Sequence, residues 1–303
     1  MADQVGIGID IGGTSIKYGI VNIEGTIEWE AQKPSNAQSS RPKVEGNIIA
    51  GIKEAFQKAK GLGVKVRSIG VGTPGLVTQQ GIVLGGGDNI IDWDNIPLRK
   101  IIEDQLGLPT FVRNDADMMA IGEVYAFKIK PTTAIFFTIG TGIGGAMIIN
   151  GKLFSGHFGL GGELGVFPIM IDGKVRNWEE VASTAAMVNA YREKCQETDA
   201  EINGKYIVKQ YLEKESIAIE TINKSTHLIG MGIAGYINIF NPEMVIIGGG
   251  ISEAGDFFIE KIKAYAHEYA LEPCVQNVKI ISASLGNRAG FVGAGIYGLL
   301  SSE

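Results

Sequence analysis

Residues 5–17 read Val5-Gly6-Ile7-Gly8-Ile9-Asp10-Ile11-Gly12-Gly13-Thr14-Ser15-Ile16-Lys17. An apolar run typical of a strand ends in an aspartate. Two glycines, a threonine and, seven residues after the aspartate, a lysine follow. This order predicts a strand whose carboxylate faces a metal-bound phosphate, then a tight turn whose backbone N–H groups face phosphate oxygens. We expect Lys17 on the next strand, pointing back at the same anion. An ordinary glycine hairpin is the alternative.

The composition is that of a globular chain. It has 303 residues, 45% of them hydrophobic and 20% charged, which is enough for two domains. The net charge of -6, without a basic block, gives no electrostatic argument for nucleic acid. No apolar stretch approaches the roughly 20 residues that span a bilayer, so we expect no membrane partner. The two cysteines lack metal spacing, and the start lacks a basic signal segment, so we expect a cytoplasmic protein.

The first half of the chain predicts the element order β-β-β-α-β-α-β-α. Glycine pairs and alternating apolar residues mark the strands, and apolar residues at helical spacing mark the helices. The expected strands are Val5–Ile11, Ser15–Val21, Thr26–Ala31, Val66–Val71 and Thr110–Val112; the expected helices are Val44–Gly61, Leu98–Leu106 and Asp115–Phe127.

The second half begins in the same way, with strand, turn and strand. The expected strands are Thr133–Ile139, Ala146–Ile149, Met244–Ile247 and Val278–Ser282, with a turn over Gly140–Gly145; the expected helices are Val181–Lys194, Tyr206–Glu213, Ser216–Phe240, Gly255–Tyr269 and Gly290–Leu300. Because each half opens with two strands around a glycine-rich turn that contains a threonine, the sequence predicts a duplicated α/β domain. Such a pair would hold a nucleotide in the cleft between the halves, with the boundary near Phe127–Pro131.

An acid follows the strand expected at Thr110–Val112. Arg113-Asn114-Asp115-Ala116-Asp117 ends that strand and opens a helix. Asp115 could cap the helix. It could equally take a proton from a substrate hydroxyl during phosphoryl transfer, and the sequence leaves both interpretations open.

A glycine-rich loop, 155–166, carries Glu163, and Glu179 and Glu180 follow shortly. Carboxylates can accept hydrogen bonds from vicinal sugar hydroxyls. We interpret Glu163 as functional, since loops carry function, and Glu180 as an acid at an exposed helix start.

Taken together, these segments resemble the ROK family (repressors, open reading frames and sugar kinases) of the hexokinase–actin superfamily. The resemblance covers nearly the whole chain and is specific because the motifs occur as an ordered set. They are Ile9-Asp10-Ile11-Gly12-Gly13-Thr14, Gly72-Thr73-Pro74-Gly75, Asn114-Asp115-Ala116, Ile139-Gly140-Thr141-Gly142-Ile143-Gly144-Gly145, Gly162-Glu163-Leu164-Gly165, Asn241-Pro242 with Ile247-Gly248-Gly249-Gly250, and Leu285-Gly286-Asn287 with Ala289-Gly290 and Gly293-Ala294.

The resemblance implies a role for each motif. Asp115 would be the general base for the sugar hydroxyl, and Asp10 would position Mg²⁺ through water. The implied sugar-binding residues are Asn89, Asn114, Glu163 and Glu179; the implied nucleotide and phosphate residues are Asp10, Gly12, Gly13, Thr14, Lys17, Gly140, Thr141, Gly142, Gly248, Gly249 and Gly250.

Three departures from the family pattern concern the sugar. Val166 stands where the family usually has a histidine, and Arg113 stands where an acid often precedes Asn114. The family's three zinc cysteines are missing, because 172–177 contains no cysteine. We therefore expect a zinc-free member with one fewer sugar-binding side chain, which leaves room for an N-acylated hexosamine or a glucoside.

The fold implied is α/β, with two RNase H-like domains of actin/hexokinase type around a nucleotide and sugar cleft. We expect a sugar kinase domain over 1–127, with the helix at about 290–303 packing back on it. A nucleotide-binding and oligomerisation domain would cover 128–289. The partners would be a sugar, ATP and Mg²⁺, and we expect a homodimer.

The implied function is an ATP-dependent hexose kinase that transfers the γ-phosphoryl group to O6 of glucose or of an N-acylated hexosamine such as N-acetylmannosamine. A β-glucoside or another hexose is the first alternative. The second is a sugar-sensing regulator without catalysis. Family repressors carry an extra N-terminal helix-turn-helix, for which a phosphate motif beginning at Ile9 leaves no room. An actin-like ATPase is a third alternative, which Glu163 with Asn114-Asp115 disfavours.

Overall fold

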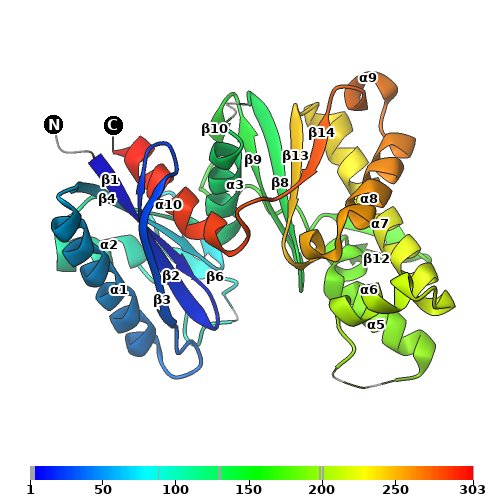
Figure 1. The fold of residues 1–303 in the computed structure, drawn as a ribbon, viewed down its shortest axis with the longest axis horizontal. Coiled ribbons are helices and arrows are strands. Elements are labelled where there is room, and N and C mark those ends of the chain that lie inside the picture. Colours follow the sequence, from blue (N-terminus) through cyan, green and yellow to red (C-terminus); the bar gives the residue numbers. More distant parts are fainter. Residues whose placement is uncertain (1–3, 88, 129–130, 198, 200, 303) are drawn as a thin grey trace. The chain divides into compact units, whose positions relative to one another are not determined.

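The computed structural model describes residues 4–302 apart from 88, 129–130, 198 and 200. The chain forms two compact units. Unit 1 consists of Met1–Lys130, Leu153–Gly162 and Ser284–Glu303, and unit 2 consists of Pro131–Lys152 and Glu163–Ala283. Two residues of the expected boundary, Ile129 and Lys130, lie outside the described residues. Each unit is built from one five-stranded sheet and its helices (Figure 1).

The sheet of unit 1 has the strand order β3-β2-β1-β4-β7. The first two pairings are antiparallel, and β1–β4 and β4–β7 are parallel. The strands are β1 (Gln4–Ile11), β2 (Ser15–Asn22), β3 (Ile27–Pro34), β4 (Lys65–Thr73) and β7 (Thr110–Asn114). The remaining elements are the short hairpin β5 (Leu76–Val77) and β6 (Val83–Gly85), and the helices α1 (Arg41–Leu62), α2 (Leu98–Leu106), α3 (Asp115–Ala126), the 3₁₀ turn η2 (Gly286–Arg288) and α10 (Ala289–Ser301).

Isoleucine and glycine alternate along β1, so one face of the strand carries apolar side chains and the other carries none. Ile7 and Ile9 are fully buried in the cluster that includes the apolar residues of α1. The alternating glycines Gly6 and Gly8 face α10, and a Cβ on Gly8 would overlap the Phe291 carbonyl oxygen. The C-terminal helix therefore lies directly on the backbone of the N-terminal strands, as the red helix among the blue strands of unit 1 in Figure 1 shows.

The sheet of unit 2 has the order β10-β9-β8-β13-β14. In both units the strands occur in the rank order third, second, first, fourth and fifth along the chain, which is the duplication that the sequence predicted. The strands are β8 (Thr133–Ile139), β9 (Ile143–Ile149), β10 (Lys152–Leu153), β13 (Met244–Gly248) and β14 (Lys279–Ser282). A separate hairpin consists of β11 (Pro168–Ile171) and β12 (Lys174–Asn177).

The helices of unit 2 enclose one apolar core around Phe137, Trp178 and Ile229. The long helix α7 runs through it and ends before Asn241-Pro242, because proline cannot continue a helix. The helices are α4 (Glu179–Ala182), α5 (Thr184–Cys195), α6 (Gly204–Leu212), α7 (Ser216–Phe240), the 3₁₀ turn η1 (Gly250–Ala254), α8 (Asp256–Tyr269) and α9 (Glu272–Val275).

Two expectations about unit 2 were wrong. The helix expected over Val181–Lys194 is broken, because Ser183 is extended and its hydroxyl accepts from the Ala186 N–H, which caps a new helix. The turn expected over Gly140–Gly145 is shorter, since β9 begins at Ile143. A Cβ on Gly145 would meet the Leu164 side chain, so this glycine serves packing inside the strand rather than a turn.

No described helix is both long enough and apolar enough to cross a bilayer.

Candidate active site

Two acids approach each other in unit 1. Asp10 lies at the end of β1, where it pairs with Lys17 of β2 and is 6% exposed. The Lys17 Nζ lies 3.7 Å from an Asp10 carboxylate oxygen. Burial raises the pKa of Asp10 to about 6, Lys17 opposes this, and the charge of Asp115 raises it further. Burial likewise raises the pKa of Asp115, against a hydrogen bond from the Ala116 backbone. A raised pKa on a carboxylate suits a proton acceptor.

At the start of α3 the residue that caps the helix and the acid predicted to be catalytic are two different residues. Asn114 is the N-cap, and its Oδ1 accepts from the Ala116 N–H at 2.8 Å while its Nδ2 donates to the Gly75 carbonyl at 3.0 Å. Asp115 is the first helical residue, and its Oδ1 lies 2.9 Å from the same N–H. Because Asn114 fills the cap, helix capping does not account for an acid at Asp115.

The turn between β1 and β2 is held by its own backbone. Gly12 donates to the Ser15 carbonyl at 2.9 Å, and the hydroxyl of Ser35 donates to the Gly13 carbonyl at 2.9 Å. Thr14 is exposed, and a Cβ on Gly13 would lie 3.2 Å from that of Asn89. The predicted residues of unit 1 therefore lie on adjoining segments around the ends of β1 and β7.

Two further residues of unit 1 join this group without having been predicted as site residues. Asn287 Oδ1 lies 3.4 Å from Lys17 Nζ. A Cβ on Gly290 would lie 2.6 Å from the Asp10 carboxyl carbon, so the start of α10 abuts this acid. Both belong to the C-terminal motif, but only tertiary packing brings Asn287 to Lys17 and Gly290 to Asp10.

The turn of unit 2 is linked to an acid. Gly140 donates to the Gly142 carbonyl at 2.9 Å, and its own carbonyl accepts from Ala185. The next N–H, that of Ile143, donates to Glu179 Oε2 at 3.0 Å. Thr141 is exposed. Glu179 thus contacts the second turn that the sequence predicts to bind phosphate, an arrangement that its expected sugar role did not include.

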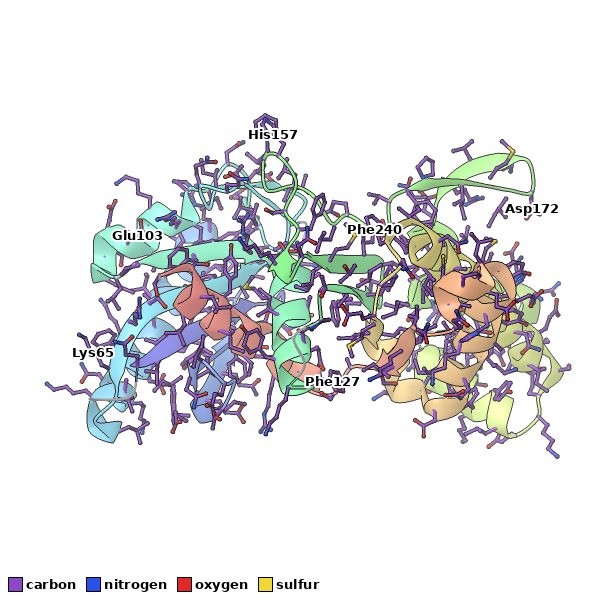
Figure 2. All side chains as sticks on the ribbon, turned by 90° about the horizontal axis from the view of Figure 1, so that it is seen from above. Lys65, Glu103, Phe127, His157, Asp172 and Phe240 are labelled. Carbon is purple, nitrogen blue, oxygen red and sulfur yellow. The ribbon has the colours of Figure 1, made fainter. Side chains whose placement is uncertain are left out.

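Glu163 is exposed and lies two residues before Gly165, whose carbonyl accepts from the Glu179 N–H at 2.9 Å. The intervening Leu164 carbonyl accepts from the Tyr236 hydroxyl. The two predicted sugar acids of unit 2 are therefore on backbone segments that are hydrogen-bonded to each other. His157 occupies the tip of the preceding loop, which belongs to unit 1 (Figure 2).

The three glycines Gly248–Gly250, at and after the end of β13, have different roles. A Cβ on Gly248 would press on the Phe136 ring, and one on Gly249, whose φ is 82°, would lie 2.5 Å from the Ile139 carbonyl oxygen. Gly250 lines a cavity of about 610 Å³ together with Thr184, Met187, Asn203, Gly204, Lys205, Val208, Ile251, Ala254 and Phe258. This volume and mainly apolar lining suit a small organic ligand. The sequence did not single out these other lining residues.

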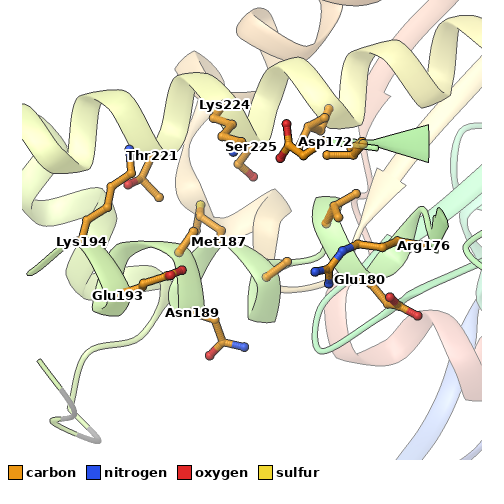
Figure 3. Close-up of a pocket in the computed structure, with 15 residues that line it drawn as sticks. Asp172, Arg176, Glu180, Met187, Asn189, Glu193, Lys194, Thr221, Lys224 and Ser225 are labelled. Atoms are coloured by element: carbon orange, nitrogen blue, oxygen red, sulfur yellow. The ribbon is translucent and has the colours of Figure 1, made fainter. Parts of the chain in front are cut away.

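A second cavity of about 620 Å³ lies between α5, α7 and the β11–β12 hairpin (Figure 3). Its described lining includes Asp172, Arg176, Glu180 and Lys224, and none of the predicted site residues. Glu180 faces this cavity although its neighbour Glu179 contacts the turn.

Segment 172–177, which lacks the family's cysteines, forms the tip and second strand of that hairpin. Within the described part of the chain, no three or more His, Cys, Asp or Glu side chains are grouped to hold a metal ion.

Comparison with known proteins gives a consistent result. The family model described as "ROK family" matches residues 6–298. A glucokinase of Streptomyces coelicolor is 32% identical over 311 residues, covering 95% of this chain and 95% of that protein. A xylose repressor of Caldicellulosiruptor bescii is 28% identical over 305 residues, covering 95% of this chain and 76% of the repressor.

Solved structures agree. A ROK family glucokinase from Streptomyces griseus, in complex with glucose and AMPPNP, is 28% identical with a TM-score of 0.79, covering 98% of this chain and 99% of that one. A Listeria monocytogenes protein, provisionally assigned as an N-acetylmannosamine kinase, is 27% identical with a TM-score of 0.81 over 98% and 99% of the two chains. The predicted α/β fold class is confirmed.

Proposed function

The chain belongs to the ROK family, and from that premise we propose that it is an ATP-dependent sugar kinase with Asp115 as the general base. The observation that carries this proposal is the pair of acids in unit 1, of which Asp10 is buried and Asp115 is half-buried. Asp115 stands at the start of α3 with a raised pKa, and Asp10 stands beside Lys17. The first can accept a proton from a sugar hydroxyl, and the second can face a cation-bound phosphate.

The remaining residues follow from this assignment. The turns with Gly12, Gly13 and Thr14 in unit 1 and with Gly140, Thr141 and Gly142 in unit 2 would face phosphate oxygens. Gly12 and Gly140 close their turns with their own N–H groups, and the residues that follow them would present theirs to the phosphates. Asn89, Asn114, Glu163 and Glu179 would bind sugar hydroxyls. Gly250 and the cavity that it lines would take the nucleoside, with Gly248 and Gly249 shaping the approach. Asp10 would hold Mg²⁺ through water, and the ion, bound together with ATP, would supply neutralisation of the charge on the transferred group.

Asp115 would then be the group of this chain that accepts the proton. An Asp115 carboxylate oxygen would take the proton of the sugar hydroxyl as the hydroxyl oxygen bonds to the γ-phosphorus of ATP. The bond from that phosphorus to the β,γ-bridging oxygen would break, and ADP would leave. Lys17 would stabilise negative charge on the phosphate and pair with Asp10, from which it is 3.7 Å away. Asn114, fixed by its cap hydrogen bond, would orient the sugar beside Asp115.

The sugar we propose is a hexose phosphorylated at O6, either glucose or an N-acylated hexosamine such as N-acetylmannosamine. Val166 supports the second choice, because this apolar side chain is 43% exposed and cannot hydrogen-bond a sugar hydroxyl. A β-glucoside fits the same argument. We also propose that the enzyme is a homodimer with domains divided near residues 127–131.

An ADP-release assay over glucose, N-acetylmannosamine, N-acetylglucosamine, mannose, fructose, allose and a β-glucoside tests the proposal. We expect Mg²⁺-dependent release with at least one sugar. Absence of release with all of them, together with sugar-dependent retention of a DNA fragment, would favour the second candidate, a regulator. The similarity to a xylose repressor is the observation that supports this candidate.

A further inference from the structure

We infer that Glu179 is a positioning residue for the phosphate turn of unit 2, and that it ties this turn to the loop that carries Glu163. The inference deepens the proposed function, because it takes from that proposal the roles of the turn 140–143 and of the loop 163–166. We infer it from contacts of Glu179 inside unit 2 that a role in sugar binding alone would not need.

The first contact is made by the side chain. Glu179 Oε2 accepts the Ile143 N–H at 3.0 Å. The carboxylate also occupies the space beside Gly142, where a Cβ would overlap the same oxygen. Glycine at 142 therefore leaves room for this carboxylate as well as for the turn itself. A hydrogen bond to a charged acceptor is among the stronger ones, so losing it should loosen the turn.

The second contact is made by the backbone. Glu179 donates its N–H to the Gly165 carbonyl at 2.9 Å, and Trp178 donates to the Phe167 carbonyl at 3.0 Å. Gly165 in turn lies directly on the Ile143 carbonyl, which a Cβ at 165 would overlap. The loop, Glu179 and the turn therefore meet at Ile143, so that moving any one of them disturbs the other two.

A rigid base holds Glu179 in place. The preceding Trp178 is fully buried, and its indole N–H donates to the Leu228 carbonyl at 3.0 Å. Its ring lies 5.8 Å from that of Phe137 and 5.4 Å from that of Phe167. A Cβ on Gly232 would overlap the indole, so a glycine there makes room for it. Since the buried ring cannot move freely, the backbone at Glu179, one residue later, is held in place, and so is the point from which its side chain extends.

One carboxylate can serve two partners. It accepts on both oxygens, so Oε2 can hold the turn while Oε1 accepts from a sugar hydroxyl. Binding of sugar and binding of nucleotide phosphate would then be coupled through Glu179, and each would change the affinity for the other by the same factor.

The test measures ADP binding in the presence of Mg²⁺ and the absence of sugar by calorimetry. We expect Glu179→Ala to weaken ADP binding about tenfold, the effect of losing one charged hydrogen bond. We expect Glu179→Gln to bind ADP within about threefold of wild type, because its amide oxygen can accept the same N–H. The matched control is Glu180→Ala, which removes the neighbouring exposed acid at the edge of the cavity in Figure 3 and should bind ADP like wild type.

Steady-state kinetics supply a readout that a merely structural role would not move. Glu179→Gln should raise the KM for sugar and leave the KM for ATP near wild type, whereas Glu179→Ala should raise both. If Glu179→Ala does not fold, Glu179→Asp keeps the charge but draws the carboxylate back from the Ile143 N–H, and it should weaken ADP binding similarly.

Two results would overturn the inference: ADP binding by Glu179→Ala equal to wild type, or equal losses in the alanine and glutamine variants. Failure of the proposed function looks different. There, wild type itself would release ADP with no sugar of the panel, whatever the variants did.

Discussion

Replacing Asp10 by asparagine should stabilise this protein at neutral pH while impairing it as a kinase. The side chain is almost fully buried, and burial raises its pKa from 3.8 to about 6. The folded protein therefore binds this proton more tightly than the unfolded chain does. It follows that the free energy of unfolding falls as the pH rises from about 4 to about 6, and is constant above that range with respect to this group.

The size of the effect follows from the two pKa values. At about 1.36 kcal/mol per pH unit, the difference between 3.8 and about 6 corresponds to about 3 kcal/mol at pH 7. The pKa of about 6 already includes the opposing charge of Lys17. One further feature reduces the gain, because the start of α10 beside Asp10 favours a negative charge. We therefore expect Asp10→Asn to be more stable than wild type by roughly 1–3 kcal/mol at pH 7.

Urea unfolding of both proteins at several pH values between 3.5 and 8, without nucleotide, measures this difference. The advantage of Asp10→Asn should vanish below about pH 4, where the wild-type acid is protonated in both states. Asp104→Asn is the control, since it removes an exposed acid paired with Lys100 and should change stability by less than about 0.5 kcal/mol. A stability difference that does not vary between pH 4 and pH 7 would refute the reasoning.

Further predictions concern turnover, metal and sugar choice. Asp115→Asn should lower kcat by about 10²–10⁴-fold with sugar binding largely kept; near wild-type kcat at saturating substrates would rule out a general base. Because burial raises the pKa of Asp115, kcat of wild type should fall on the acid side at a pH above the ordinary range for an aspartate, and a profile flat down to pH 4 would contradict this. The protein should contain no stoichiometric zinc, and chelators should leave its Tm unchanged; one tightly bound zinc per chain in elemental analysis would contradict the missing cysteines. Val166→His should raise kcat/KM for glucose relative to N-acetylmannosamine, since an unsatisfied hydroxyl costs about 1–3 kcal/mol; a lower preference for glucose in the variant would refute the account of this pocket.

The strands and long helices were readable from the sequence because their signals are local. Apolar runs between glycine turns gave β1, β2 and β8 within a residue or so, and Asn241-Pro242 gave the end of α7. The break at Ser183 was missed because a serine within a helical pattern can either face solvent or cap a new helix. Only its extended backbone decides between the two. The short hairpin β11–β12 carries too few residues for a periodic signal.

The predicted and the missed site residues differ in the same respect, namely whether a local signal or a tertiary contact places them. Asp10, Lys17 and Asn114 stand at strand or helix ends, where a local motif fixes their position. Asn287 reaches Lys17, and Gly290 reaches Asp10, only because α10 and the turn before it pack on β1 and β2 across almost the whole length of the chain. No spacing rule within a short window can predict such a contact.

Glu179 and Glu180 show where local reasoning stops. As neighbours in the short helix α4 they have the same propensity and the same exposure to the helix dipole. A helix turns about 100° per residue, so they must face different surroundings. The buried indole of Trp178 fixes which acid faces which surface: Glu179 meets the Ile143 N–H, and Glu180 meets the cavity beside α7. The role of each acid is therefore decided by a tryptophan that touches no predicted ligand. A side chain added at Gly232, which packs against that indole, should therefore disturb the turn predicted to bind phosphate more than it disturbs Asp10 and Asp115 of unit 1.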